Sequence, residues 1–272
     1  MAESESEARS EAETSRWRRA VGRVPFLDRW LRRLRRSDEV AALQAHLARL
    51  RGTDAEPFLV RWPPGHFYSP VPNMKEIQEH EARIFERPHH LTGLDLNEEA
   101  QLALLHTLAP LCDGVTFNTE RRPDRRYWTD NPSYSIGDAL VLQAMLRHLR
   151  PRRYLEIGSG WSTALALDTN DQWLDGSLRI TCVEPYPRDL KKLLRPGDDV
   201  EVLAVGVQEV ELERFADLEA GDILFIDCSH VVKTGSDAHH LITRVLPMVP
   251  VGVYIHIHDI FWAFEYPKEW VY

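Results

Sequence analysis

YLEIGSGWST, residues 154–163, is a short β-rich run that passes through two glycines into a helical segment. Gly158 and Gly160 permit backbone conformations and a close ligand approach that a Cβ would block. The N-terminus of the helix that follows favours anionic groups. A G-x-G pair alone is also typical of an ordinary tight turn between a strand and a helix. Its meaning therefore depends on the sequence around it.

Short β-rich runs alternate with helical runs from Pro151 to the end of the chain. This alternation predicts βαβ units and an α/β fold, a Rossmann-like, doubly wound and mostly parallel sheet of strand order 3-2-1-4-5. Ligands bind such sheets outside the carboxyl ends of the strands. The predicted strands are 154–157, 180–183, 200–205, 223–226 and 253–257, and the predicted helices between them are 162–168, 188–194, 212–218 and 237–245.

The second predicted strand ends at Glu184, 24 residues after Gly160. A carboxylate at this place can accept both ribose hydroxyls of an adenosine. Dinucleotides and S-adenosylmethionine (SAM) both fit that geometry, but Thr163 occupies the third glycine position of the dinucleotide motif. Glu156 also suits a cofactor with an amino group and a sulfonium, and it repels a pyrophosphate. The pattern favours SAM, and an NAD-dependent oxidoreductase is the less favoured alternative.

Several longer strings carry a more specific resemblance. YLEIGSGWST, VEPYP (183–187), FIDCSH (225–230), KTGSD (233–237) and HIHDIFWAFEYPKEW (256–270) occur in this order, after GHFYSPVPNMKE and NPSYSIGDAL. The chain from about His66 onward resembles bacterial class I SAM-dependent methyltransferases associated with glycan and natural-product genes. The resemblance implies SAM as the cofactor. With it we expect O-methylation of a hydroxyl on a sugar, a glycan intermediate or a natural product.

The same resemblance implies a set of cofactor-binding residues. Glu156, Gly158 and Gly160 would border the methionine part of SAM, and Glu184 would bind the ribose. Gln208 would lie near the adenine, and Asp227 would face the methyl group. The other residues expected at the cofactor are Tyr134, Ser135 and Asp138, which would close over it, and Ser159, Ser162, Pro185 and Tyr186.

Acidic residues and histidines follow the fourth and fifth predicted strands. Asp227, His258 and Asp259 could together bind a divalent cation, magnesium through oxygen ligands or a transition metal if histidine takes part. Catechol O-methyltransferase is similar in holding a metal with acidic residues at these two strand ends. The alternative is that Asp227 and Asp259 only form hydrogen bonds with neighbouring loops.

His230 is the candidate general base, with Asp227 beside it in the catalytic pair. It follows Asp227 by three residues on the loop that faces the cofactor, and its unperturbed pKa lies near neutrality. A histidine in this position can instead fix the loop or cap a helix. Both roles remain open from the sequence.

Composition limits the partners. Lys plus Arg is 33 against 42 for Asp plus Glu, and this net charge of -9 argues against nucleic acid. The expected partner is a small-molecule or glycan acceptor. The three cysteines form no C-x-x-C pair, which is typical of a reducing compartment, so we expect a cytoplasmic protein. No apolar run approaches the roughly 20 residues of a transmembrane helix.

The first half of the chain is expected to be an extension of the catalytic domain. Residues 1–15 form an acidic tail predicted to be disordered, residues 16–130 an Arg-rich arm and helical extension, and residues 131–272 the SAM-binding domain. Within the arm, the basic amphipathic run 26–36 can dock on its own domain or make peripheral contact with an anionic membrane or a partner. Further helices are predicted at 40–50, 74–85, 97–111 and 136–150.

The sequence reaches Tyr272 soon after the fifth predicted strand. We therefore expect the domain to be short at its C-terminus, without the antiparallel strand pair that follows in full class I methyltransferases. An open sheet edge of this kind can pair with another chain. The alternative function is thus an inactive SAM-binding or interaction protein, in which a homodimer could form through this edge.

Overall fold

The computed structural model describes residues 61–272 and divides the chain into two compact units, Met1–Phe85 and Glu86–Tyr272. In the described part of the first unit, the helix predicted at 74–85 is two short helices, α5 (Met74–Glu79) and α6 (Glu81–Ile84). The acidic tail, the Arg-rich arm and the helix predicted at 40–50 lie outside the described residues.

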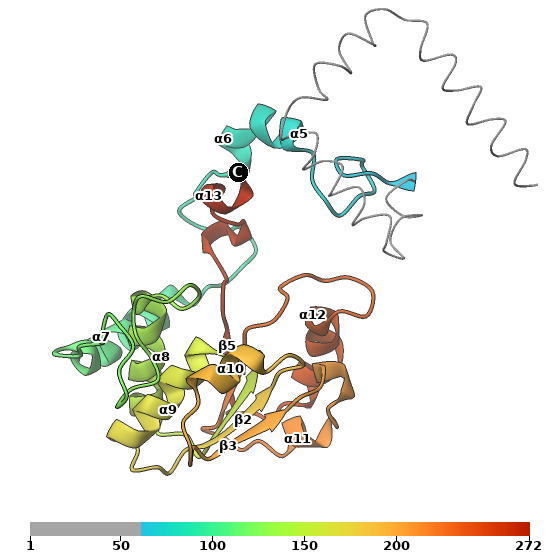
Figure 1. Cartoon of the computed structure of the whole chain (residues 1–272). Coiled ribbons are helices and arrows are strands. Elements are labelled where there is room, and N and C mark those ends of the chain that lie inside the picture. The colour runs from blue at the N-terminus through green and yellow to red at the C-terminus, as the bar shows by residue number, and fades with distance from the viewer. Residues whose placement is uncertain (1–60) are drawn as a thin grey trace, which may run out of the picture. The chain divides into compact units, whose positions relative to one another are not determined.

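The second unit is built on a five-stranded sheet (Figure 1). All of its strand pairs are parallel and the order is β3-β2-β1-β4-β5, as predicted. The strands are β1 (Arg153–Ile157), β2 (Arg179–Val183), β3 (Val200–Leu203), β4 (Ile223–Ile226) and β5 (Tyr254–Ile257). Within residues 61–272 no antiparallel strand follows β5, which is succeeded by the 3-10 turn η4 (Trp262–Phe264) and by α13 (Lys268–Val271).

Helices cover both faces of this sheet (Figure 1). Side chains alternate along each strand, so Tyr154 and Phe225 enter one apolar core while Leu155 and Ile226 enter the other. The first core packs against α8 (Ile136–Leu149), α9 (Trp161–Trp173) and α10 (Arg188–Leu193). The second packs against α11 (Glu213–Ala216) and the π-helical turn η2 (Leu241–Val245), which directly follows α12 (Asp237–His240).

The sheet-bearing unit, Glu86–Tyr272, also contains residues that precede the predicted boundary at 131. One reason is that α7 (Glu98–Cys112) packs against α8. The other is the buried guanidinium of Arg126, which bonds to Asp168 at 2.9 Å and to Asp171 at 2.7 Å on α9, and also pairs with Asp198. This network fixes the connector before α8 to the domain.

Candidate functional site

The loop after β1 passes directly against the end of β4. Gly158 has a φ of +84°, and a Cβ on it would lie 1.8 Å from the backbone oxygen of Asp227. Backbone hydrogen bonds of 3.0 Å from Gly158 to Val183 and of 2.8 Å from Asp227 to Ile157 tie three strand ends together. Position 158 therefore requires glycine on steric grounds, while its predicted place beside the methionine part of SAM stays a prediction.

Glu156 is fully buried on the α9 face of β1. Its carboxylate accepts hydrogen bonds from Ser162 and, at 2.5 Å, from Thr163. Burial raises the pKa of Glu156 to about 7, although these hydroxyls act in the opposite direction. Glu156 lines none of the cavities described below. In this structure it holds the first turn of α9, and a direct contact with the cofactor stays a prediction.

The first cavity, called here the β2–β3 cavity, has a volume of about 490 Å³. The Glu184 carboxylate accepts the Tyr186 backbone N–H at 2.7 Å, and the Gln208 amide donates to the Gly235 carbonyl at 2.8 Å. The structure thus gathers five of the predicted residues around one space. The lining includes Gly158, Glu184, Pro185, Gln208 and Asp227, together with residues 228, 229, 233 and 235–237 of the loop after β4.

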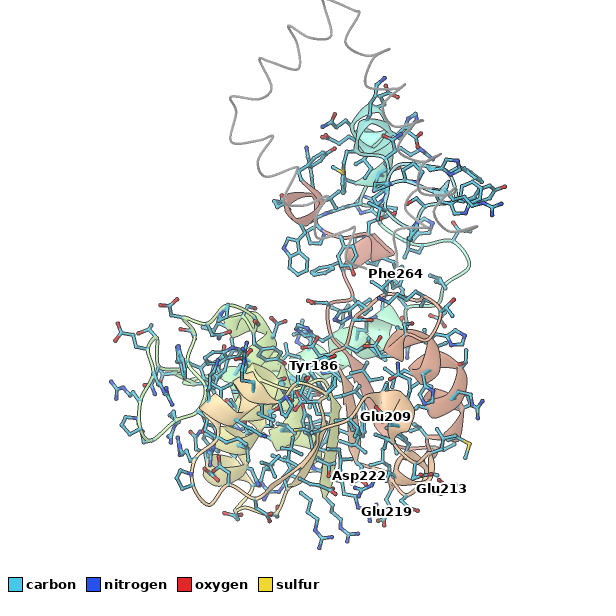
Figure 2. The ribbon with its side chains drawn as sticks, turned by 45° about the vertical axis from the view of Figure 1, so that its right-hand side comes forward. Tyr186, Glu209, Glu213, Glu219, Asp222 and Phe264 are labelled. Atoms are coloured by element: carbon cyan, nitrogen blue, oxygen red, sulfur yellow. The ribbon has the colours of Figure 1, made fainter. Side chains whose placement is uncertain are left out.

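Tyr186 does not line that space. Its side chain is 83% exposed. Figure 2 shows Tyr186 at the end of the sheet reached by β2, whereas Asp222 and Glu219 lie at the opposite end. Its backbone N–H fixes the Glu184 carboxylate, so Tyr186 contributes through its main chain.

The second cavity, called here the Trp128 cavity, measures about 660 Å³. It lies between the glycine loop, α10 and the connector before α8, and Asp227 forms part of its wall as well. The Tyr134 hydroxyl and the Ser159 hydroxyl are buried in this region without a hydrogen-bond partner among residues 61–272. The predicted residues that line this cavity are Tyr134, Ser159, Gly160, Ser162 and Asp227.

Ser135 and Asp138 form a capping box at the start of α8. The Ser135 hydroxyl donates to the Asp138 carboxylate at 2.6 Å, and neither side chain lines the two cavities. The other carboxylate oxygen of Asp138 is 3.6 Å from Nε2 of His258. Asp138 therefore contacts the site through His258. The closure of Ser135 and Asp138 over the cofactor stays a prediction.

Asp227 is the centre of an acid–histidine cluster. Its Oδ1 is 3.2 Å from Nε2 of His230 and 3.7 Å from Nδ1 of His258. Burial opposes ionisation of Asp227, but His258 and His230 outweigh it and lower the pKa of Asp227. Burial likewise opposes charge on His258, yet the carboxylates of Asp227, Asp259 and Asp138 raise its pKa overall. Asp227 thus stands as a carboxylate between two imidazoles.

Among residues 61–272, the side chains close enough together to hold a metal ion are Asp227, His230 and Asp259, whose ligand atoms all lie within 4.8 Å of one another. The predicted trio contains His258 instead of His230. His258 lies close to both carboxylates and its ring stacks on Tyr134, so its place among the metal ligands stays a prediction. His230 and Asp259 both have a φ of 56°, an uncommon backbone conformation for residues other than glycine.

Some residues at the two cavities were not singled out from the sequence. Lys233 and Asp237 line the β2–β3 cavity, and they belong to the KTGSD string quoted above. Arg121 and Lys192 line the Trp128 cavity. The arginines at 121–126 fall within the predicted extension 16–130, and their position beside the glycine loop depends on tertiary packing.

Comparison with known proteins identifies the family. Residues 155–260 match a family model described as a methyltransferase domain. An uncharacterized protein of Archaeoglobus fulgidus is 36% identical over 165 residues, which cover 58% of this chain and 74% of the archaeal protein. The chain belongs to this methyltransferase family. With its 3-2-1-4-5 sheet, the methyltransferase is a class I, SAM-dependent enzyme.

Solved structures with some similarity to the methyltransferase include a Podospora anserina methyltransferase bound to S-adenosylhomocysteine (SAH). It has a TM-score of 0.36 and 18% identity, with 63% of this chain and 74% of that chain covered. A putative protein-L-isoaspartate O-methyltransferase of Plasmodium falciparum, in complex with SAH, has a TM-score of 0.29 and 13% identity, with 47% and 62% covered. Among residues 61–272 of the methyltransferase, no helix has the length and apolarity needed to cross a membrane.

Proposed function

We propose that the protein transfers the methyl group of SAM to a hydroxyl group of a sugar, a glycan intermediate or a natural product. The observation that carries this proposal is the meeting of two cavities at Asp227, beside the imidazole of His230. SAM supplies a methyl group on a positively charged sulfur. The residues of the chain must then hold SAM, orient the acceptor and take up the acceptor's proton.

The β2–β3 cavity suits the adenosine part of SAM. One carboxylate oxygen of Glu184 is held by the Tyr186 N–H, so the other can accept the ribose hydroxyls. Gln208 lies on the same wall, where the adenine is expected. The unpartnered hydroxyls of Tyr134 and Ser159 in the neighbouring Trp128 cavity are donors available to the methionine part.

His230 is the proposed general base. With the proton on Nε2, the imidazole donates to Asp227 at 3.2 Å and leaves Nδ1 free to accept the proton of the attacking hydroxyl. Asp227 then both orients the ring and stabilises the imidazolium that forms. This arrangement favours oxygen as the acceptor atom, because a hydroxyl must lose its proton as it attacks.

If a divalent cation binds at this site, the same residues have a different role. Asp227, His230 and Asp259 offer two carboxylates and one imidazole, a donor set that suits Mn²⁺ or another transition ion better than Mg²⁺. His230 cannot act as the base while it coordinates a metal through the nitrogen beside Asp227. Activity that survives exhaustive chelation supports the base, and activity restored only by Mn²⁺ supports the metal.

A second candidate function is that of an inactive SAM-binding or interaction protein. It is favoured by the outer edge of β5, where Ile255 and Ile257 are 45% and 43% exposed. Size-exclusion chromatography with light scattering tests for a pairing chain. A dimer without methyl transfer to any hydroxylated acceptor would favour this candidate.

Calorimetric titration with SAM and SAH tests the cofactor assignment. The wild-type protein is expected to bind both, and Glu184→Gln is expected to weaken binding about tenfold, because a charge-assisted hydrogen bond to the ribose is lost. Glu213→Gln, an exposed change on α11, is the matched control. Folded wild-type protein that gives no heat with either ligand would contradict the proposal.

A further inference from the structure

The far wall of the Trp128 cavity is basic, although the protein as a whole carries a net charge of -9. Arg121 and Lys192 line this wall, together with Asp189. A second cavity of about 390 Å³ adjoins it and shares Arg121, Trp128 and Leu193 with it. The additional cationic residues of the second cavity are Arg122, Arg125, Arg126 and Arg195. Positive charge is thus concentrated at one end of the space that begins at Asp227.

Most of these cations already have acidic partners. The three aspartates around Arg126 neutralise it, Arg195 is 3.8 Å from Asp168, and Lys192 is 2.5 Å from Asp189. Arg121 and Arg122 differ, since none of the carboxylates in residues 61–272 lies within 4.0 Å of either guanidinium, and of the two only Arg121 lines the Trp128 cavity. A charge without a counter-ion beside a cavity favours an anionic ligand.

Arg121 is held in place without being neutralised. Its Nη2 donates to the Lys192 carbonyl at 3.1 Å, and its guanidinium lies 5.9 Å from the centre of the Trp128 ring. Trp128 in turn packs edge-on against Trp161 with ring centroids 4.3 Å apart. One edge of the guanidinium remains free to bind a planar or tetrahedral anion through two N–H groups.

The opposite end of the cavity also offers donors without acceptors. The N-terminus of α9, a helix of 13 residues, opens at Gly160 and Trp161. The hydroxyl of Tyr134, a residue that is 2% exposed, has no hydrogen-bond partner there. The cavity therefore has two anion-attracting ends, one at the glycine loop and one at Arg121.

We propose that Arg121 binds an anionic group of the acceptor, a phosphate or a carboxylate, while the acceptor's hydroxyl lies at Asp227 and His230. This inference rests on the proposed function and narrows its substrate class to anionic acceptors. The carboxylate of SAM is the other source of an anion, and the end of the cavity at α9 and Tyr134 is the place assigned to it. Both ligands can then be bound at once.

The test is calorimetric titration of inorganic phosphate into the full chain, with and without saturating SAH. Phosphate is expected to bind in both conditions. Arg121→Gln is expected to weaken phosphate binding about tenfold or more, since an ionic hydrogen-bonding partner is lost. Arg188→Gln is the matched control, because Arg188 lies on the same helix as Lys192 but lines neither cavity, and its side chain is 83% exposed.

Three results would overturn the inference. Phosphate binding could be absent from folded wild-type protein, or it could be equal in Arg121→Gln. Alternatively, SAH could displace phosphate while Arg121→Gln weakens SAH and leaves 5′-methylthioadenosine, which lacks the carboxylate, unchanged. That last pattern would mean that Arg121 binds the carboxylate of the cofactor. A protein that binds phosphate through Arg121 but never binds SAH would contradict the proposed function alone.

Discussion

Replacing Glu156 with glutamine should change how the stability of the protein depends on pH. In the folded chain the carboxyl is fully buried and its pKa is about 7, whereas the ordinary value is 4.5. Below pH 4.5 the group is neutral in both the folded and the unfolded chain. As the pH rises from 4.5 to 7, the unfolded chain releases this proton and the folded chain keeps it.

The free energy of unfolding must therefore fall across this window. Each unit of pKa difference corresponds to about 1.4 kcal/mol, so the difference between 4.5 and 7 is worth about 3 kcal/mol. The loss is complete above pH 7. Glu156→Gln keeps the shape and a hydrogen-bonding end group next to Ser162 and Thr163, but it cannot ionise.

Urea unfolding of both proteins, followed by circular dichroism at several pH values between 4.5 and 8, measures this effect. The stability of wild type minus that of Glu156→Gln should decrease by about 3 kcal/mol as the pH rises, because the contributions of all other groups cancel. Glu213→Gln, at the exposed position labelled in Figure 2, should give a flat difference. A flat or rising difference for Glu156→Gln would refute the assignment of a raised pKa.

Three other changes test the rest of the site. Gly158→Ala places a Cβ 1.8 Å from the Asp227 carbonyl, so thermal unfolding should show a loss of about 1–3 kcal/mol or more, and an unchanged melting temperature would contradict the packing. Arg126→Met leaves buried aspartates without their cation and should cost about 3–5 kcal/mol in urea unfolding, unlike Arg125→Met on the neighbouring residue. His230→Gln should lower kcat about 100-fold or more in a methyl-transfer assay while the Kd for SAH stays the same, and a normal kcat would exclude the general base.

The sheet could be predicted because each strand is marked by a short stretch of its own sequence. β-rich runs bounded by turns located β1, β2, β4 and β5 to within a residue or so, and their alternation with helices predicted the parallel order. The strand ends then located Glu184 and Asp227. Residues that follow strands in such a sheet converge whatever the details of packing.

The parts that could not be predicted depend on which neighbour a side chain meets. The sequence identifies Glu156 as a carboxylate beside a glycine loop, but only the packing of α9 shows that Ser162 and Thr163 take up its oxygens. Similarly, the spacing predicts His230 as the base and His258 as a metal ligand. Only the structure shows that His230 lies within reach of Asp227 and Asp259 together and that His258 stacks on Tyr134.

The Asp227 side chain belongs to the walls of both the β2–β3 cavity and the Trp128 cavity. Two ligands that contact the same residue do not bind independently. The first ligand to bind changes the electrostatic potential and the position of Asp227, and both affect the affinity for the second ligand. The affinity for either one is then a function of the concentration of the other. The binding of each ligand must therefore be measured at several concentrations of the other, because two separate isotherms do not describe it.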